Sequence, residues 1–255
     1  MLIDNWGRKI TYLRISVTDR CNFRCVYCMP PEGLVWQPHN AILTYEEITE
    51  VARAAALQGV RQIRLTGGEP LVRADLPVLV RMLAGIPGID DISLTTNATL
   101  LERFALDLAE AGLTRVNVSL DTLDPAKFSR ISRGGSLEKV LAGIKAAEEA
   151  RLMPIKINAV AMRGINDDEF LALAGLTIDH PWHVRFIELM PIGNQIPWGP
   201  DFPTPQDAFI TIQEIFERLE PLGLVKEAGE TGSGPAIEYR IPGGKGKIGF
   251  ISPLS

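Results

Sequence analysis

Short runs rich in β-branched residues alternate with longer runs of helical periodicity along the first 190 residues. The predicted strands are Tyr12–Val17, Arg61–Thr66, Asp91–Thr96, Arg115–Leu120, Ile155–Ala161 and His183–Leu189. The predicted helices between them are Thr44–Leu57, Leu76–Ala84, Leu100–Ala111, Ser136–Arg151 and Asp167–Leu176. Such alternation predicts βαβ units and an α/β fold with a parallel sheet.

Within each predicted strand, apolar and polar residues alternate. Parallel strands buried on both faces usually read as continuous apolar runs instead. The second strand is an example, because Ile63 and Leu65 have one parity while Gln62, Arg64 and Thr66 have the other. If the apolar parity packs under the helices, the polar parity faces a shared interior. A closed barrel fills its interior with branched apolar residues, so the pattern predicts a partial (βα)6 TIM-like barrel with a polar, ligand-filled lumen.

The polar parity carries several cations, namely Arg14, Arg64 and Lys156, which Arg185 would join. Each of them taken alone also fits a solvated position at a sheet edge. The chain as a whole is acidic, with a formal net charge of −5. Cations that converge inside an acidic protein favour an anionic ligand such as a phosphate or a carboxylate.

Beyond residue 190 the strand and helix rhythm weakens. Pro191–Pro205 is rich in proline and glycine and is typical of a loop, and Pro205–Leu219 has helical periodicity. The runs Ala236–Ile241 and Lys247–Ile251 flank a Pro-Gly-Gly-Lys-Gly turn and predict a hairpin. We therefore expect a barrel core over residues 1–190 and a C-terminal extension of helix and hairpin over 191–255 that packs on it.

All three cysteines, Cys21, Cys25 and Cys28, lie within eight residues in the spacing C-x3-C-x2-C. Full protein ligation of a 4Fe–4S cluster normally uses four cysteines, so three would leave one iron open. An open coordination position is where metal chemistry takes place. A zinc site completed by His39 and a set of packing cysteines are the alternatives. The odd count and the chain length disfavour a disulfide framework.

Polar motifs follow the predicted strands at their carboxyl ends, where α/β folds place ligands. Gly67 and Gly68 allow a close backbone approach to a ligand, although Gly-Gly-Glu alone also fits an ordinary turn. These motifs are Thr66-Gly67-Gly68-Glu69-Pro70, Thr95-Thr96-Asn97, Asn117-Val118-Ser119-Leu120-Asp121 and Glu188-Leu189-Met190-Pro191. Neither a Walker-A sequence nor G-x-G-x-x-G is present.

Composition excludes some classes of protein. The negative charge argues against a nucleic-acid surface, and the lack of an 18-residue apolar run argues against a membrane span. The N-terminal sequence lacks the apolar stretch of a signal peptide. We therefore expect a cytoplasmic protein whose cysteines stay reduced.

The cysteine motif, with Tyr27 just before Cys28, resembles the signature of radical S-adenosylmethionine (SAM) enzymes. Gly67–Pro70 resembles the second motif of that family, which contacts the amino group of the methionine. The segments 13–25, 63–73, 117–121 and 186–190 further resemble the GTP 3′,8-cyclases, the radical SAM enzymes that begin molybdenum cofactor synthesis. The similarity runs from Trp6 to Pro253.

The resemblance implies roles for particular residues. Three residues would hold a 4Fe–4S cluster whose open iron chelates SAM: Cys21, Cys25 and Cys28. Four would line the SAM site: Tyr27, Gly68, Ser119 and Met190. Four would contact GTP: Arg14, Arg64, Thr95 and Lys156. No side chain is implied as a catalytic acid, base or nucleophile.

The resemblance also implies a reaction and its partners. An external one-electron donor reduces the cluster, a 5′-deoxyadenosyl radical takes the 3′ hydrogen of GTP, and the ribose then bonds to C8 of guanine. The product is (8S)-3′,8-cyclo-7,8-dihydroguanosine 5′-triphosphate, which a downstream cyclic pyranopterin monophosphate synthase uses. The alternatives are a radical SAM enzyme for another anionic substrate and a non-catalytic iron–sulfur carrier. A carrier needs neither an open iron nor a polar lumen.

The chain departs from this family at its C-terminal end. GTP 3′,8-cyclases carry a second 4Fe–4S cluster, held by three further cysteines, that contacts the guanine. Here the sequence ends at Gly249–Ser255, about where those cysteines would begin. The expectation is a truncated, inactive form or a single-cluster variant that lacks the guanine end of the substrate site. An open sheet edge there would favour association into a homodimer.

Overall fold

The computed structural model describes residues 2–190, 198–227 and 236–252, so Pro253 and part of the predicted loop Pro191–Pro205 lie outside the described residues. The chain divides into two compact units. The first comprises Met1–Asn22, Val35–Asn117 and Lys139–Met153, and the second comprises Phe23–Leu34, Val118–Glu138 and Pro154–Ser255. These two units differ from the predicted core of residues 1–190 and extension of residues 191–255, and that predicted boundary stays a prediction.

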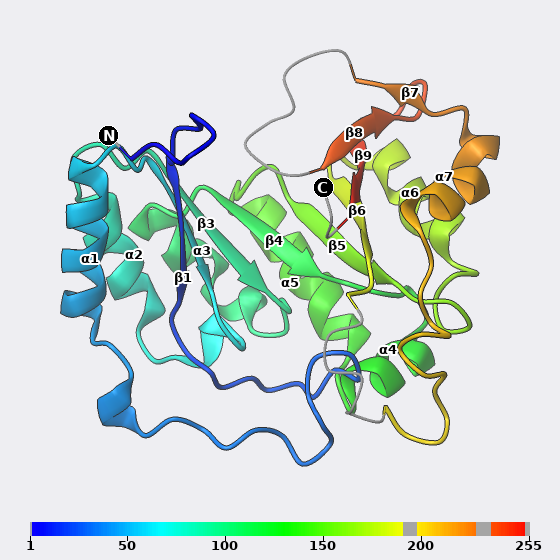
Figure 1. The fold of residues 1–255 in the computed structure, drawn as a ribbon, viewed down its shortest axis with the longest axis horizontal. Helices are drawn as coiled ribbons and strands as arrows, with labels where there is room; N and C mark the ends of the chain where they lie inside the picture. The colour runs from blue at the N-terminus through cyan, green and yellow to red at the C-terminus, as the bar shows by residue number, and fades with distance from the viewer. Residues whose placement is uncertain (1, 191–197, 228–235, 253–255) are drawn as a thin grey trace. The chain divides into compact units, whose positions relative to one another are not determined.

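The first unit is a parallel sheet with helices that follow its strands. Its strand order is β1 (Tyr12–Ser16), β2 (Gln62–Thr66), β3 (Asp91–Thr96) and then the first half of β4 (Arg115–Ser119). The helices are α1 (Tyr45–Leu57), α2 (Leu76–Ala84), α3 (Leu101–Ala111) and nearly all of α5 (Leu137–Glu149). Helix α2 lies beside both α1 and α3 (Figure 1). The sequence pattern predicted every one of these elements to within two residues at either end.

Two local rules explain this agreement. The Thr44 hydroxyl accepts a hydrogen bond from the Glu47 amide (3.2 Å), and the Glu47 carboxylate accepts one from the Thr44 amide (2.8 Å), so the predicted capping box begins α1. The apolar parity of β2 is fully buried at Ile63 and Leu65. Burial of an aliphatic side chain of this size contributes about 1.5–3 kcal/mol.

The second unit continues from the second half of β4. Its strand order is β5 (Lys156–Ala161), β6 (His183–Glu188), β9 (Lys247–Ile251), β8 (Ile237–Arg240) and β7 (Val225–Lys226). The predicted hairpin is confirmed, because β8 and β9 pair antiparallel. Strand β9 also pairs parallel with β6, so the hairpin continues the sheet of this unit. The helices are α4 (Pro125–Ser132), α6 (Phe170–Asp179) and α7 (Ile212–Leu219).

The helices of the second unit depart most from the sequence pattern. Helix α7 begins at Ile212, not near Pro205, because Thr211 caps it by accepting from the Glu214 amide (3.2 Å). Helix α6 begins three residues later than predicted, since the Asp167 carboxylate accepts from the Gly164 amide (2.8 Å) in a preceding turn. The sequence pattern did not predict α4.

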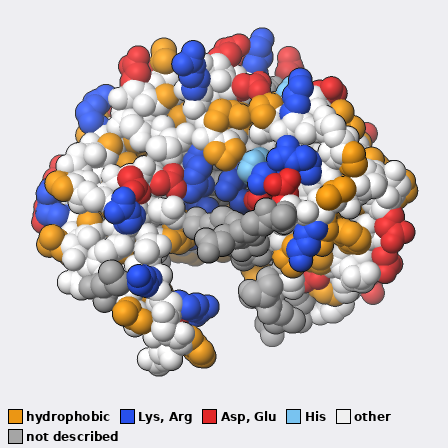
Figure 2. All heavy atoms as spheres, turned by 90° about the horizontal axis from the view of Figure 1, so that it is seen from above, with side chains coloured by type: hydrophobic (Ala, Val, Ile, Leu, Met, Phe, Trp, Pro, Cys, Tyr) orange, Lys and Arg blue, Asp and Glu red, His pale blue; other side chains and the backbone are white. Residues whose placement is uncertain are grey.

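The outer surface mixes acidic and basic side chains over the face drawn in Figure 2. Exposed large apolar side chains include Trp6, Val35 and Leu57. Among the residues that the structure describes, no helix has the length and apolar character to cross a membrane.

Candidate functional site

The glycine motif, Gly67–Pro70, is hydrogen-bonded to the segment that leads into Cys21. The Gly68 amide donates to the Thr18 carbonyl and the Glu69 amide donates to the Arg20 carbonyl, both at 2.8 Å. A Cβ on Gly67 would lie 2.2 Å from the Thr18 carbonyl oxygen, and one on Gly68 would lie 2.2 Å from that of Arg20. Gly67 also has a φ of +138°, which favours glycine. The glycines therefore permit a close approach to the chain's own backbone immediately before the first cysteine.

Glu69 ties this loop to the end of β3. Its side chain is 1% exposed, and its carboxylate accepts from the Leu71 amide (3.0 Å), the Thr96 hydroxyl (2.7 Å) and the Asn97 amide (2.6 Å). Burial raises the pKa of Glu69, and these hydrogen bonds oppose the shift. Glu69 is thus a structural link between two strand-end motifs that the sequence had singled out separately.

The same network extends to the residue after Cys21. The Asn97 side-chain amide donates to the Asn22 Oδ1 (2.8 Å), and the Asn22 side-chain amide donates to the Thr99 hydroxyl (2.9 Å). Both neighbours of Cys21 are therefore held, Arg20 by the glycine loop and Asn22 by the end of β3.

Cys25 and Cys28 lie in the second unit, in a turn closed by hydrogen bonds from the Cys28 and Met29 amides to the Cys25 carbonyl (2.9 and 3.2 Å). This turn runs beside α4 (Figure 1), where the Val26 amide donates to the Ile131 carbonyl (2.9 Å). Helix carbonyls at a C-terminus lack partners within the helix. The cysteine segment satisfies them here.

Tyr27 points its hydroxyl at Asp121 and donates a 2.7 Å hydrogen bond to the carboxylate. The other carboxylate oxygen accepts from the Val160 amide (2.9 Å). Burial raises the pKa of Asp121 to about 6 despite these bonds. Burial also raises the pKa of the Cys28 thiol, with the Asp121 charge as the second cause.

None of the three cysteines is in a disulfide; Cys21 and Cys25 are half-buried and Cys28 is exposed. Over the described ranges, no three His, Cys, Asp or Glu side chains are grouped as ligands of one metal ion. His39, the residue that would complete a zinc site, lies with its Nε2 3.5 Å from the Arg20 guanidinium. In a 4Fe–4S cluster each cysteine binds a different iron, so its sulfurs need not converge on one point. Three reduced thiols are the donor set that such a cluster requires.

The cations of the first unit share one face of its sheet. Arg14 is directly opposite Arg64 in register, and Arg64 is opposite Ser93. Arg14 is exposed and Arg64 is half-buried. Burial lowers the pKa of Arg64; Arg14 and Arg115 add to that effect, and Tyr12 opposes it. Repelling guanidinium groups on one face of a sheet favour a bound anion.

The sheet of the second unit also carries cations, of which Lys247 is ion-paired with Glu238 (3.1 Å). In register, Lys156 lies opposite His183 and His183 opposite Lys247, while Arg185 lies opposite Gly249. Arg185 is 5% exposed, and a Cβ on Gly249 would lie 3.1 Å from its Cγ.

His183 titrates under the influence of this face. Burial lowers its pKa to about 4, so the ring is neutral near pH 7 although its Nδ1 lies 3.8 Å from a Glu238 oxygen. The charged groups that act on it are Glu238, Lys156, Arg185 and Lys247.

The remaining predicted contact residues lie at strand ends. Thr95 is half-buried near the end of β3, Ser119 is half-buried at the last position of β4, and the Met190 side chain is 52% exposed just after β6. Their roles toward SAM or GTP stay predictions.

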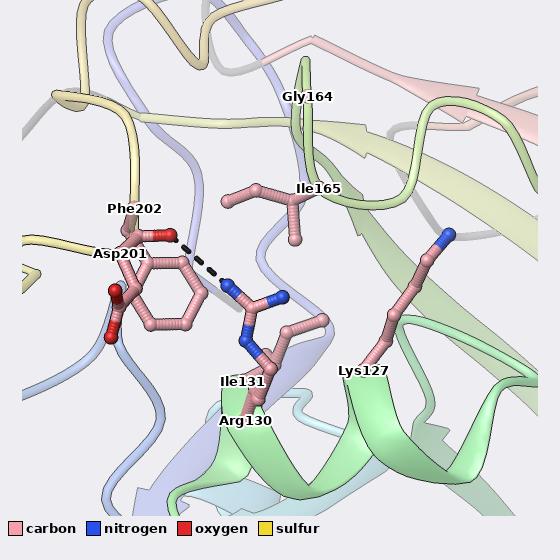
Figure 3. Close-up of a pocket in the computed structure, with 7 residues that line it drawn as sticks. All are labelled: Lys127, Arg130, Ile131, Gly164, Ile165, Asp201 and Phe202. Carbon is pink, nitrogen blue, oxygen red and sulfur yellow. Dashed lines mark hydrogen bonds between the residues drawn. The ribbon is translucent and has the colours of Figure 1, made fainter.

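Sequence reasoning missed α4, and with it two arginines. Arg130 donates to the Asp201 carbonyl (3.0 Å) and lies over the Phe202 ring (Figure 3). Arg133 follows the helix and contacts the cysteine segment. The signals for this helix were Asp124, whose side chain accepts from the Lys127 amide (2.8 Å), and the proline at its first position.

Comparison with known proteins decides the family. Residues 15–177 match the model of the radical SAM superfamily. The chain is 54% identical over 252 residues to a GTP 3′,8-cyclase of Pelotomaculum thermopropionicum, covering 99% of this chain and 76% of that protein. It is 52% identical over 256 residues to one of Desulforamulus reducens, covering 100% of this chain and 77% of that protein. The chain belongs to the GTP 3′,8-cyclase family of radical SAM enzymes. Enzymes of this superfamily use a 4Fe–4S cluster and SAM.

Solved structures agree on the fold. The peptide-bound SuiB of Streptococcus suis superimposes with a TM-score of 0.63 at 18% identity over 82% of this chain and 45% of SuiB. Methylornithine synthase superimposes with the same TM-score and identity, over 82% of this chain and 62% of that chain. These likenesses support the predicted α/β, partial TIM-like barrel class.

Proposed function

We propose that this protein converts GTP to (8S)-3′,8-cyclo-7,8-dihydroguanosine 5′-triphosphate in molybdenum cofactor biosynthesis. The observation that carries the proposal is the identity of about half of all residues to curated GTP 3′,8-cyclases over practically the whole chain. The cysteine segment and its two bracing networks support it, because they provide three thiols on an ordered backbone.

In this proposal the chain supplies binding and orientation. Cys21, Cys25 and Cys28 hold the cluster, which together with SAM supplies a 5′-deoxyadenosyl radical when bound. Four residues line the SAM site: Tyr27, Gly68, Ser119 and Met190. Gly68 already donates its amide to the Thr18 carbonyl, so any contribution to SAM comes from its bare Cα surface and its carbonyl oxygen.

The substrate site in this proposal is cationic. Arg14, Arg64 and Lys156 hold the triphosphate, and Thr95 contacts the nucleotide. A primary carbon radical attacks most C–H bonds within reach, so the position of the ribose decides the product. Fixing the triphosphate therefore directs the 3′ carbon toward the radical, and the protein excludes water from it.

The proposal includes partners. An external one-electron donor reduces the cluster, the product passes to cyclic pyranopterin monophosphate synthase, and the reaction takes place in the cytoplasm. Association into a homodimer, and the division into a core of residues 1–190 and an extension, are further parts of the proposal.

One experiment tests the reaction. The cluster is reconstituted anaerobically, SAM, GTP and dithionite are added, and 5′-deoxyadenosine and cyclised nucleotide are measured. Both products are expected, and a Cys28→Ala variant should form neither. Absence of 5′-deoxyadenosine from the wild-type protein would refute radical SAM activity. Its formation without cyclised GTP would show that these 255 residues do not complete the cyclisation. A screen of other anionic substrates would then test the second candidate, a radical SAM enzyme for another anionic substrate.

A further inference from the structure

Arg133 donates hydrogen bonds to the residues on either side of the two cysteines of the second unit. Its Nη1 donates to the carbonyl of Arg24, the residue before Cys25, at 2.9 Å. The same nitrogen donates to the carbonyl of Met29, the residue after Cys28, at 2.8 Å. One guanidinium thus links both ends of the six-residue segment, Arg24 to Met29, that carries the two thiols.

The same side chain reaches a third segment. Its Nη2 donates to the Trp198 carbonyl at 3.1 Å. Trp198 is 7% exposed and packs in an apolar cluster with Val26, the residue after Cys25. The guanidinium therefore connects the cysteine turn with the buried cluster that Trp198, Val26 and Ile131 of α4 share. A planar fork with several donors can make these three bonds at once, whereas the single ammonium of a lysine fits them less well.

The backbone at Arg133 is held in an unfavourable conformation. Its φ of 55° and ψ of 58° are left-handed, at the position after the helix where glycine is commonest. A non-glycine residue there costs roughly 1–2 kcal/mol, although Gly134 and Gly135 follow directly. A long side chain thus occupies a strained position, and strain of this kind points to a function for the residue.

We propose that Arg133 is a positioning residue that sets the separation and orientation of Cys25 and Cys28 before the cluster is loaded. The inference rests on the proposed role of these cysteines as cluster ligands.

A second consequence is electrostatic. The fixed positive charge beside the cysteine turn favours the more negative, reduced form of the cluster, because net charge and hydrogen bonding set the potentials of iron–sulfur clusters.

Thiol alkylation of the metal-free protein tests the geometry without any activity assay. The protein is treated with a limiting concentration of iodoacetamide, and peptide mass spectrometry measures the alkylation rate of each cysteine separately. In Arg133→Gln, the loss of two charge-assisted hydrogen bonds should raise the rates at Cys25 and Cys28 about tenfold. Cys21 is the internal reference, because the glycine loop and Asn22 hold its neighbours.

Arg130→Gln is the matched control. Arg130 lies on the same helix but bonds the Asp201 carbonyl, so its removal should leave all three rates within about twofold of the wild type. Equal acceleration at all three cysteines, or equal effects of the two substitutions, would overturn the proposal. If Arg133→Gln does not fold, Arg133→Lys is compared with the wild type instead, because it leaves the backbone strain unchanged. The alkylation rates at Cys25 and Cys28 should then rise about threefold.

The loaded cluster gives a second readout that a purely structural role would not change. Redox titration followed by electron paramagnetic resonance should give a more negative midpoint potential for Arg133→Gln than for Arg133→Lys, which keeps the charge. Equal potentials in these two variants would overturn the electrostatic part. Absence of cyclase activity in every protein, with the alkylation pattern as expected, would refute the proposed function and leave the positioning role intact.

Discussion

Replacement of Gly68 by alanine should disrupt the link between the glycine loop and the segment before Cys21. The added Cβ would lie 2.2 Å from the Arg20 carbonyl oxygen, 2.5 Å from the Arg20 carbonyl carbon and 2.8 Å from the Asp19 carbonyl oxygen. All three atoms are backbone, so no flexible side chain can move aside. Relief of the overlap requires the loop to withdraw from the chain that leads to the first cysteine.

The magnitude follows from the contacts. Withdrawal breaks the bonds from the Gly68 and Glu69 amides to the Thr18 and Arg20 carbonyls, which contribute about 1 kcal/mol each. Overpacking adds about 1–3 kcal/mol. The free energy of unfolding of Gly68→Ala should therefore fall by roughly 3–5 kcal/mol.

Urea denaturation of the metal-free protein, followed by tryptophan fluorescence, measures this difference. Gly175→Ala is the control, because Gly175 lies in α6 with no heavy atom within 4 Å of an added Cβ. That substitution should be neutral or should stabilise by up to about 1 kcal/mol. The reasoning is refuted if the two alanine variants unfold at free energies within about 0.5 kcal/mol of each other.

Three further outcomes are expected. Glu69→Gln should lower the free energy of unfolding by about 2 kcal/mol, measured by urea denaturation, because an amide cannot accept from all three donors; an unchanged value would contradict the role of Glu69 as a link. The folded-state pKa of His183 lies below its usual value of 6.5, at about 4, so stability should rise with pH across that window, by up to about 3 kcal/mol. Between pH 4 and 6.5, the free energy of unfolding of His183→Leu should rise by about 3 kcal/mol less than that of the wild type. An equal rise in the two proteins would show that His183 does not titrate in this way. Arg64→Ala should weaken GTP binding, measured by calorimetry of the loaded protein, at least tenfold more than SAM binding, whereas Arg53→Ala on α1 should change neither; equal losses for the two ligands would exclude a phosphate role for Arg64.

The sequence predicted the βα rhythm and the hairpin well, because strand alternation, the Thr44 capping box and the turn glycines are local signals. It also placed the polar motifs at the carboxyl ends of the strands. It did not show that Glu69 bonds the end of β3, since that contact joins residues 27 and 28 positions apart. A buried carboxylate with three donors has no signature in the residues around it.

Helix α4 was missed for a different reason. With eight residues it is too short for a convincing apolar period, and only Asp124, the following proline and the two glycines after Arg133 mark its ends. Its contribution to the cysteine segment depends on carbonyl oxygens of Ile131 and Ser132, which every residue type provides. Backbone contacts of this kind cannot be inferred from side-chain patterns.

The Glu69 network has a consequence for how ligands bind. The glycine loop, the end of β3 and both neighbours of Cys21 are hydrogen-bonded to one another by groups of the chain itself. The conformational entropy of ordering these loops is therefore lost during folding and is not subtracted from the binding free energy of the cofactors. Such preorganisation predicts that cluster and SAM meet a surface already in its binding shape, so that association depends on encounter and not on a slow rearrangement of this part of the chain.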